Sequence, residues 1–157
     1  MMYDIAVVIM IGVFSIYFYF ITKSFGVLDS ISLSFYKLEE QKRNRGWWFL
    51  AFAWGLGFPM VVFLEFSGLF MIPIFCVLLL GAAPQYKRKM TETVHLIGAL
   101  GSLGSALILI GIVFGNWWCI GGVLAAIGLL RIFKTRNLTT WEETVAFIGT
   151  CVGLLIR

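Results

Sequence analysis

Long apolar stretches, interrupted by short charged segments, run along the whole chain. Residues 5–22 carry no charge, Glu65 is the single charge between residues 46 and 86, and residues 93–130 lack Asp, Glu, Lys and Arg. A transmembrane helix needs about 20 predominantly apolar residues. The pattern therefore predicts an all-α fold, a polytopic membrane helix bundle with six transmembrane helices in three hairpins. The expected spans are at about residues 5–22, 47–65, 68–85, 92–114, 117–133 and 140–156.

The connection between the first two predicted spans has a pattern of its own. Apolar residues recur there at helical spacing, with charged residues away from that stripe; the stripe consists of Leu28, Ile31, Phe35 and Leu38. We expect one interfacial amphipathic helix at about residues 27–41, lying in the inner interface of the membrane. It either covers the cytoplasmic end of the bundle or serves as a gate or a docking surface for a partner.

The positive charges predict the orientation of the bundle. Five Lys and Arg residues lie between the first and second spans, three between the third and fourth, and three between the fifth and sixth, which leaves only Arg157 of the twelve elsewhere. Cytoplasmic loops of membrane proteins carry an excess of Lys and Arg. The sequence thus predicts a multi-pass protein of the cell inner (plasma) membrane, with both termini outside and the basic loops in the cytoplasm.

Composition excludes several classes of protein. Hydrophobic residues make up 61% of the 157 residues and charged residues 13%, with a net charge of +4. Soluble domains carry about 25% charged residues, and a soluble fold of about 150 residues cannot bury this much apolar surface. A soluble enzyme, a nucleic-acid-binding domain and a disulfide-stabilised secreted module are excluded. We expect a single transmembrane domain over residues 1–157 that contacts membrane lipid and no nucleic acid.

The fourth predicted span carries the candidate functional face. His95, the single histidine, lies there on one side of the helix with Gly98, Ser102 and Ser105. This face either lines a pathway or ligand site, because polar groups in membrane helices usually face the bundle interior, or packs closely against a neighbouring helix. The candidate inner-face partners of His95, at a similar depth, are Glu92, Glu142 and Glu143.

Glu65 is a second candidate for the pathway. It follows Pro59, which is expected to kink the second span. The carboxylate either lines a cation entrance or marks the outer water boundary.

Two of the predicted spans begin alike. Residues 92–98 and 143–149 share Glu-Thr-Val at the start and Ile-Gly at the end, each after a basic loop. The match is either a duplicated hairpin or a shared helix start, with Thr91 and Thr140 as N-caps and acidic residues in the first turn. Glycines are frequent in these spans, and they bring helices together within one chain or between copies of it, so a homo-oligomer stays open.

The residues needed for most known chemistries are missing. One histidine cannot build a histidine-rich metal site. The chain also has no G-x-S-x-G nucleophile elbow and no phosphate-binding P-loop. We therefore expect no catalytic residues, no metal and no cofactor.

Three stretches carry a resemblance. Residues 30–36 run into Trp47 and Trp48, and Gly81-Ala82-Ala83-Pro84-Gln85 precedes Val94 and His95. Together they resemble uncharacterised small multi-pass membrane proteins of bacteria and their phages. The resemblance implies a prokaryotic inner membrane and no particular activity.

Three functions fit these observations. The first is a non-enzymatic conduit or transporter for a small solute or ion, formed by one chain or by a homo-oligomer. The second is a structural or regulatory subunit whose protein partner docks at the cytoplasmic loops. The third is a lipid-binding or lipid-processing protein.

Overall fold

The computed structural model describes the backbone of residues 2–42, 45–63, 68–82 and 88–156, and their side chains except at residues 2–3, 62–63, 82 and 88–96. Within these ranges the chain forms seven α-helices, a short 3-10 helix and no strand, which confirms the all-α prediction. The elements are α1 (Met2–Phe25), α2 (Leu33–Gln41), α3 (Trp47–Phe63), η1 (Gly68–Phe70), α4 (Met71–Ala82), α5 (Arg88–Phe114), α6 (Trp117–Ile132) and α7 (Leu138–Leu155).

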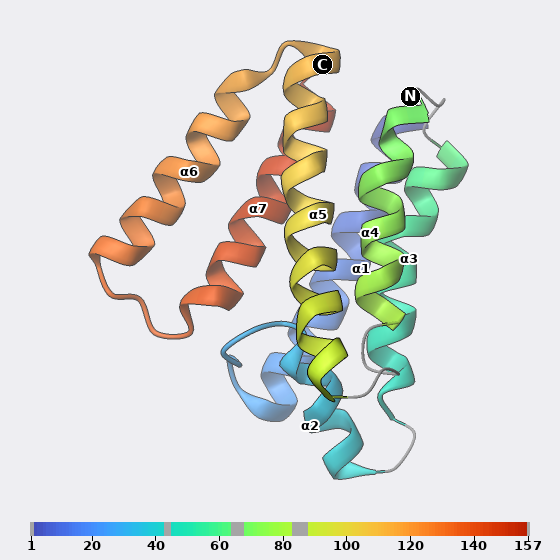
Figure 1. The fold of residues 1–157 in the computed structure, drawn as a ribbon, viewed down its shortest axis with the longest axis vertical. Helices are drawn as coiled ribbons and strands as arrows, with labels where there is room; N and C mark the ends of the chain where they lie inside the picture. Colours follow the sequence, from blue (N-terminus) through green and yellow to red (C-terminus); the bar gives the residue numbers. More distant parts are fainter. Residues whose placement is uncertain (1, 43–44, 64–67, 83–87, 157) are drawn as a thin grey trace.

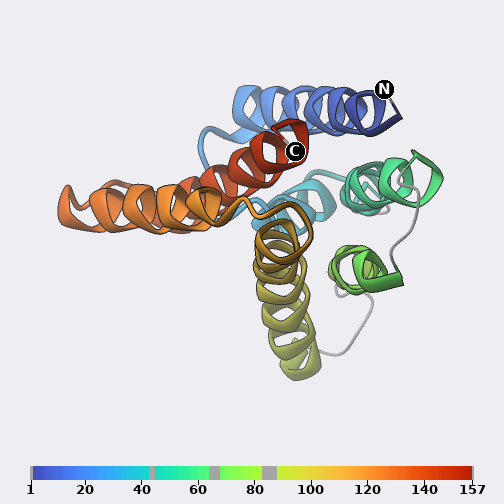
Figure 2. The ribbon, with the colours of Figure 1, turned by 90° about the horizontal axis from the view of Figure 1, so that it is seen from above.

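Five of the helices form a closed ring. Going round it, α1 packs against α3, α3 against α4, α4 against α5, α5 against α7, and α7 against α1. Helix α6 lies outside this ring, against α5 and α7. The order is clear when the ribbon is seen from above (Figure 2). The centre of the ring is therefore surrounded by helices that are far apart in the sequence.

The two ends of the ring differ in what they carry. Both termini lie at one end, while α2 and the turn between α6 and α7 lie at the other (Figure 1). Lys37 belongs to α2 and Arg45 follows it, while Lys134 and Arg136 lie in the α6–α7 turn. The described loop cations thus gather at the end opposite to the termini, as the sequence predicts for three hairpins with basic connections.

Glycines end two of the long helices. Gly26 follows α1 and Gly115 follows α5, with φ of 74° and 70°. Each donates its backbone N–H to the carbonyl four residues earlier, at Thr22 and Gly111. Glycine adopts this left-handed conformation without the strain that a Cβ causes, so it terminates helices well. The second of these turns separates α5 from α6, at the position where the sequence predicts one span to end and the next to begin.

Among the described residues, two helices are long and apolar enough to cross a membrane. They are Asp4–Phe25 and Ile97–Phe114, and in an apolar stretch of 18 residues in each, 28% and 39% of the residues are buried. Shorter apolar helices cover Trp47–Val61, Gly68–Gly81 and Trp117–Ile132. These findings indicate association with a membrane, while the number of spans stays a prediction.

The interfacial helix begins later than the sequence indicates. We expected it to start near residue 27, but α2 begins at Leu33. Residues 26–32 instead form an irregular segment, here called the bridging loop, whose backbone groups bond to α7 rather than to each other along a helix. The predicted apolar stripe does face inward, because Leu38 is fully buried and Leu28, Ile31 and Phe35 pack against the core.

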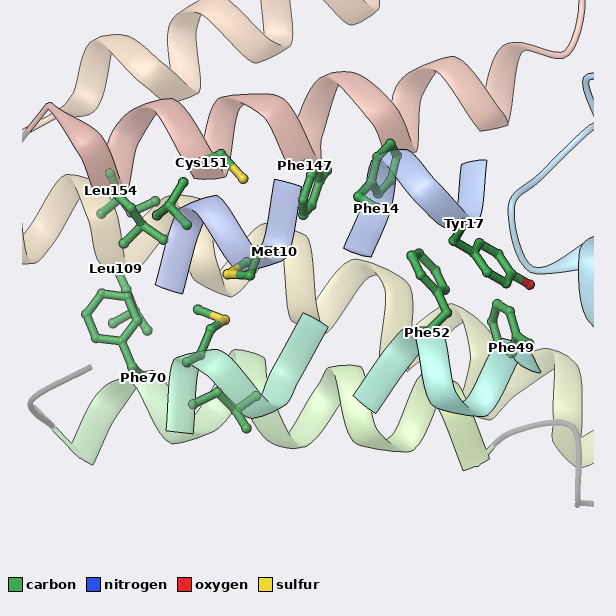
Figure 3. Close-up of a cluster of buried hydrophobic side chains, with 14 of the residues drawn as sticks. Met10, Phe14, Tyr17, Phe49, Phe52, Phe70, Leu109, Phe147, Cys151 and Leu154 are labelled. Atoms are coloured by element: carbon green, nitrogen blue, oxygen red, sulfur yellow. The ribbon is translucent and has the colours of Figure 1, made fainter. Parts of the chain in front are cut away.

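The core consists of side chains from the ring and from α2. Aromatic rings gather near α2, where Figure 3 shows Phe14, Tyr17, Phe49, Phe52 and Phe147, while Leu109, Leu154 and Phe70 lie toward the other end. Each buried aromatic side chain removes 150–250 Å² from water or lipid in typical proteins. Stacked rings thus join α1 to α7 at Phe14 and Phe147, and α1 to α3 at Tyr17 and Phe52.

Close approach between α4 and α5 depends on a missing side chain. A Cβ at Gly98 would lie 3.1 Å from the backbone nitrogen and Cα of Leu80, so α4 packs directly on the α5 backbone there. A Cβ at Gly104, two turns further along α5, would have no neighbour within 4 Å. The two glycines therefore differ in role although they share a helix.

We predict that Gly98→Val destabilises the fold while Gly104→Val has little effect. Both substitutions change the helix propensity of α5 equally, but only the first forces α4 away, at a cost of about 1–3 kcal/mol for overpacking. Thermal unfolding of the two variants in detergent micelles measures the difference. Equal midpoints would show that the α4–α5 contact does not need a glycine.

Candidate functional site

A cavity of about 90 Å³ lies in the middle of the five-helix ring. All five ring helices and the bridging loop contribute side chains to its wall. Most of these are apolar: Met10, Phe14, Ile31, Phe49, Phe52, Ala53, Leu56, Met60, Pro73, Val77, Leu80, Ala99, Leu103, Ala106 and Phe147. The polar ones are Ser32, Ser102, Glu143 and Thr150. The cavity is thus an oily space with few polar groups.

Four phenylalanine rings form the wall nearest to α2. Phe14 of α1 stacks on Phe147 of α7, with ring centroids 4.3 Å apart, and Phe52 of α3 stacks on Tyr17 at 4.1 Å. Phe49 completes the group, at 6.1 Å from Phe52. These contacts hold the rings in fixed positions, so this wall of the cavity is built before a ligand arrives (Figure 3).

The hydroxyl groups of the wall are already satisfied. Ser102 donates to the carbonyl of Ala99, and Thr150 donates to that of Ala146, each on its own helix. Ser32 shares a hydrogen bond of 2.9 Å with Ser30. Helical serine and threonine commonly bond in this way to the preceding turn. Among the described lining residues, Glu143 is left as the charged group of the cavity.

Glu143 joins α7 to the bridging loop. Its Oε2 accepts a hydrogen bond of 2.9 Å from the backbone N–H of Ile31, and the residue is half-buried. An ionised carboxylate can accept about four hydrogen bonds through its two oxygens. The contact with Ile31 therefore occupies only part of its capacity.

Two residues at the start of α7 also bind the bridging loop. The Asn137 side-chain amide donates to the carbonyl of Val27 over 2.6 Å, and the Thr140 hydroxyl donates to that of Leu28 over 2.6 Å. The backbone N–H of Thr140 also donates to the carbonyl of Asp29, at 3.2 Å. Asn137 directly precedes the helix, and Thr140 and Glu143, three residues apart, lie on one side of it. The loop is thereby held against the first two turns of α7.

Helix α2 continues from the bridging loop across the end of the ring. Ser34 is fully buried and shares a hydrogen bond of 2.6 Å with the Tyr17 hydroxyl of α1. Leu38, one turn later, is also fully buried. Of the two roles that the sequence leaves open for this segment, the observed position matches a cover of the bundle end.

The structure separates the predicted site residues into three groups. Ser102 and Glu143 line the cavity. Ser105 donates its hydroxyl to the carbonyl of Gly101, and Glu142 forms an ion pair of 2.7 Å with Arg131 of α6, and neither lines the cavity. Glu65 and the side chains of Glu92 and His95 lie outside the described residues, so the pairing of His95 with these carboxylates stays a prediction.

Sequence reasoning missed the role of Thr140 and the aromatic wall. Thr140 was expected to cap a helix, but α7 begins at Leu138, after Asn137 in the left-handed conformation with φ of 57°. The Thr140 hydroxyl therefore points out to the bridging loop. A signal existed in the spacing of Thr140 and Glu143, which places two hydrogen-bonding side chains on one face of an apolar helix, shortly after Asn137.

The described residues offer no metal centre. No group of three or more His, Cys, Asp or Glu side chains in that part of the chain could hold a metal ion. The three cysteines Cys76, Cys119 and Cys151 are free thiols.

Comparison with known proteins gives no further guide to the site. No protein-family model, no curated protein and no solved structure matches the chain. The function must therefore be argued from the cavity and its wall.

We predict that Thr140→Val loosens the bridging loop. Valine has nearly the same shape but leaves the carbonyl of Leu28 without its donor, which costs about 1–3 kcal/mol for a buried group. Hydrogen–deuterium exchange of residues 28–34 should accelerate by roughly five- to a hundredfold, since about 1.4 kcal/mol corresponds to a factor of ten.

Thr144→Val is the matched control for this experiment. Its hydroxyl donates to the carbonyl of Thr140 within α7, so its hydrogen bond is internal to the helix. The control should leave exchange of residues 28–34 unchanged. An equal acceleration in both variants would contradict the role given to Thr140.

Proposed function

We propose that the chain is a non-enzymatic, multi-pass membrane protein that binds a small apolar or amphipathic molecule inside the five-helix ring. The observation that carries this proposal is the apolar cavity, which side chains from five helices and from the bridging loop line. Ligand sites in helical proteins commonly lie between helices and are largely apolar with a few polar groups. Of the three functions that fit the sequence, this is the lipid-binding one, widened to other amphipathic ligands.

The outer surface of the helix bundle supports a membrane location. Large apolar side chains point away from the bundle, with Ile16 and Ile132 each 73% exposed and Leu124 63% exposed. Soluble monomers rarely carry contiguous apolar patches of more than a few hundred Å². Lipid is the environment in which such a surface is stable.

The charges support a particular threading. In the proposed topology α1, α3, α4, α5, α6 and α7 all cross the membrane, with the termini outside and α2 at the cytoplasmic side. The described loop cations lie at the same end as α2 (Figure 1), as the excess of Lys and Arg in cytoplasmic loops requires. The resemblance to bacterial membrane proteins is the basis for proposing an inner membrane.

The lining of the cavity favours an apolar ligand over a hydrated one. A hydrated ion must exchange its water for polar groups of the protein, and the hydroxyls of Ser102 and Thr150 already donate to their own helices. Apolar cavities of this kind stay dry and bind apolar molecules. A water-filled conduit and a role as a subunit stay predictions from the sequence.

The cavity volume limits the size of the ligand. A water molecule needs about 10–15 Å³ measured in the same way, so about 90 Å³ has room for several groups of that size. An alkyl chain of about eight carbon atoms is a suitable probe.

We predict that the two ends of the bundle are reached from opposite sides of the membrane. Lys134→Cys in the α6–α7 turn and Leu69→Cys in η1 each add an exposed thiol, in a chain whose native cysteines are replaced by alanine. A membrane-impermeant maleimide applied outside intact cells should label Leu69→Cys alone. Labelling of both, or of Lys134→Cys alone, would contradict the proposed topology.

We predict that Ala106→Leu abolishes binding of 1-octanol. Ala106 is buried in the wall of the cavity, and leucine adds three carbon atoms to that space. A ligand present at about 100 times its Kd stabilises the folded state by about 2.7 kcal/mol. The unfolding midpoint of the unmodified chain in micelles should therefore rise with 1-octanol, and that of the variant should not.

Two further variants complete this test. Ala125→Leu makes the same change at an exposed position of α6 and should keep the response to 1-octanol. Val77→Phe fills the cavity from α4 and should lose it. If all four chains respond equally, the cavity is not the binding site.

A further inference from the structure

The described wall of the cavity combines one carboxylate with a cluster of aromatic rings. We propose that the ligand is a hydrophobic cation, an alkyl- or arylammonium whose apolar part fills the cavity and whose positive charge lies at Glu143. This inference rests on the proposed function, because it names the class of ligand for the same cavity.

The first argument concerns charge. The part of Glu143 that faces the cavity is in contact with apolar groups, where an ionised carboxylate is unfavourable unless a partner compensates it. The described residues give it one hydrogen bond, from the Ile31 N–H, and the described lining residues include no Lys or Arg. Arg131 of α6 is paired with Glu142 on the exposed side. A bound cation would supply the missing partner.

The second argument concerns the aromatic rings and is independent of the first. Phe147 follows Glu143 by four residues and so lies on the same face of α7, and Phe14 stacks against it. Phe49 and Phe52 add two more rings to the wall. The face of an aromatic ring attracts a cation, and groups of such rings are a recurring site for ammonium ligands. The charge of the carboxylate and the faces of the aromatic rings therefore each favour a cationic ligand.

The same arrangement disfavours other ligands of equal size. An anionic head group would be repelled by Glu143, and a neutral chain would bring no opposite charge to the carboxylate. Specificity for the cation comes from the difference between its affinity and that of a ligand with another charge. The prediction is therefore a ranking of three ligands that share one chain and differ in charge.

The experiment compares n-octylammonium, 1-octanol and octanoate at pH 7.5 in micelles of a neutral detergent. Binding to the full chain is measured by titration calorimetry. We expect n-octylammonium to bind about tenfold or more tightly than 1-octanol, and octanoate to bind most weakly. Equal affinity for n-octylammonium and 1-octanol would overturn the inference.

Two neighbouring carboxylates provide the variant and its control. Glu143→Gln keeps the shape and a carbonyl oxygen for the Ile31 N–H but removes the charge, so the preference for n-octylammonium over 1-octanol should fall severalfold, to what the aromatic rings alone supply. Glu142→Gln removes a charge one residue away that does not line the cavity, and should keep the preference. A preserved preference in Glu143→Gln would overturn the inference.

A second variant guards against misfolding of the first. Phe147→Leu keeps an apolar side chain in the wall but removes the ring next to Glu143, so it should weaken n-octylammonium severalfold and leave 1-octanol almost unchanged. If none of the three ligands binds the unmodified chain, the proposed function fails together with this inference. If 1-octanol binds and the charge has no effect, only the inference fails.

Discussion

The contact between the bridging loop and the first turns of α7 is the constraint on which the rest of the structure depends. Helices α1 and α7 come from opposite ends of the chain, and the hydrogen bonds from Asn137, Thr140 and Glu143 tie α7 to the segment that leaves α1. They reinforce the α1–α7 contact that closes the ring and start α2 at the position from which it covers the end of the cavity. In a low-dielectric environment an unsatisfied backbone carbonyl or N–H costs several kcal/mol, so this loop requires donors and acceptors from α7. The other end of α7 is held too, because the Asn116 side chain donates to the carbonyls of Gly153 and Ile156.

The same contact explains why two adjacent carboxylates have different environments. Successive residues of an α-helix point about 100° apart, so when Glu143 faces the bridging loop and the ring, Glu142 faces α6 and pairs with Arg131. An exposed ion pair of this kind contributes little to stability, about 0–1 kcal/mol. Glu143 is the more consequential residue, because it bonds a backbone group of the loop and faces the cavity at the same time. Glu143 therefore lies between the bridging loop and the interior of the cavity.

Local pattern predicted the elements well and their contacts poorly. The charge-free stretches and the glycine turn at residue 115 gave the order and the approximate bounds of the helices, because apolar length and backbone freedom are local properties. The predicted start of the interfacial helix near residue 27 was wrong, since α2 begins at Leu33. Residues 28 and 31 fit the apolar stripe, but their backbone groups form hydrogen bonds with side chains of α7, 112 residues later. The face containing Ser102 was recognised as polar, yet Gly98 on it serves close packing on Leu80. No periodicity in one segment reveals which distant segment it meets, so the cavity and its aromatic wall were beyond reach.

The cavity follows from the number of helices in the ring. Neighbouring helices pack with axes about 8–10 Å apart, so a ring of five leaves a central opening of about 3 Å radius beyond the helix surfaces, against about 2 Å for a ring of four. Side chains must fill that opening, and the stacked rings of Phe14 and Phe147 do so only near α2. Toward the middle, Ala53, Ala99 and Ala106 contribute short side chains to the wall. Small residues at these positions leave space that larger ones would close, at a cost in packing.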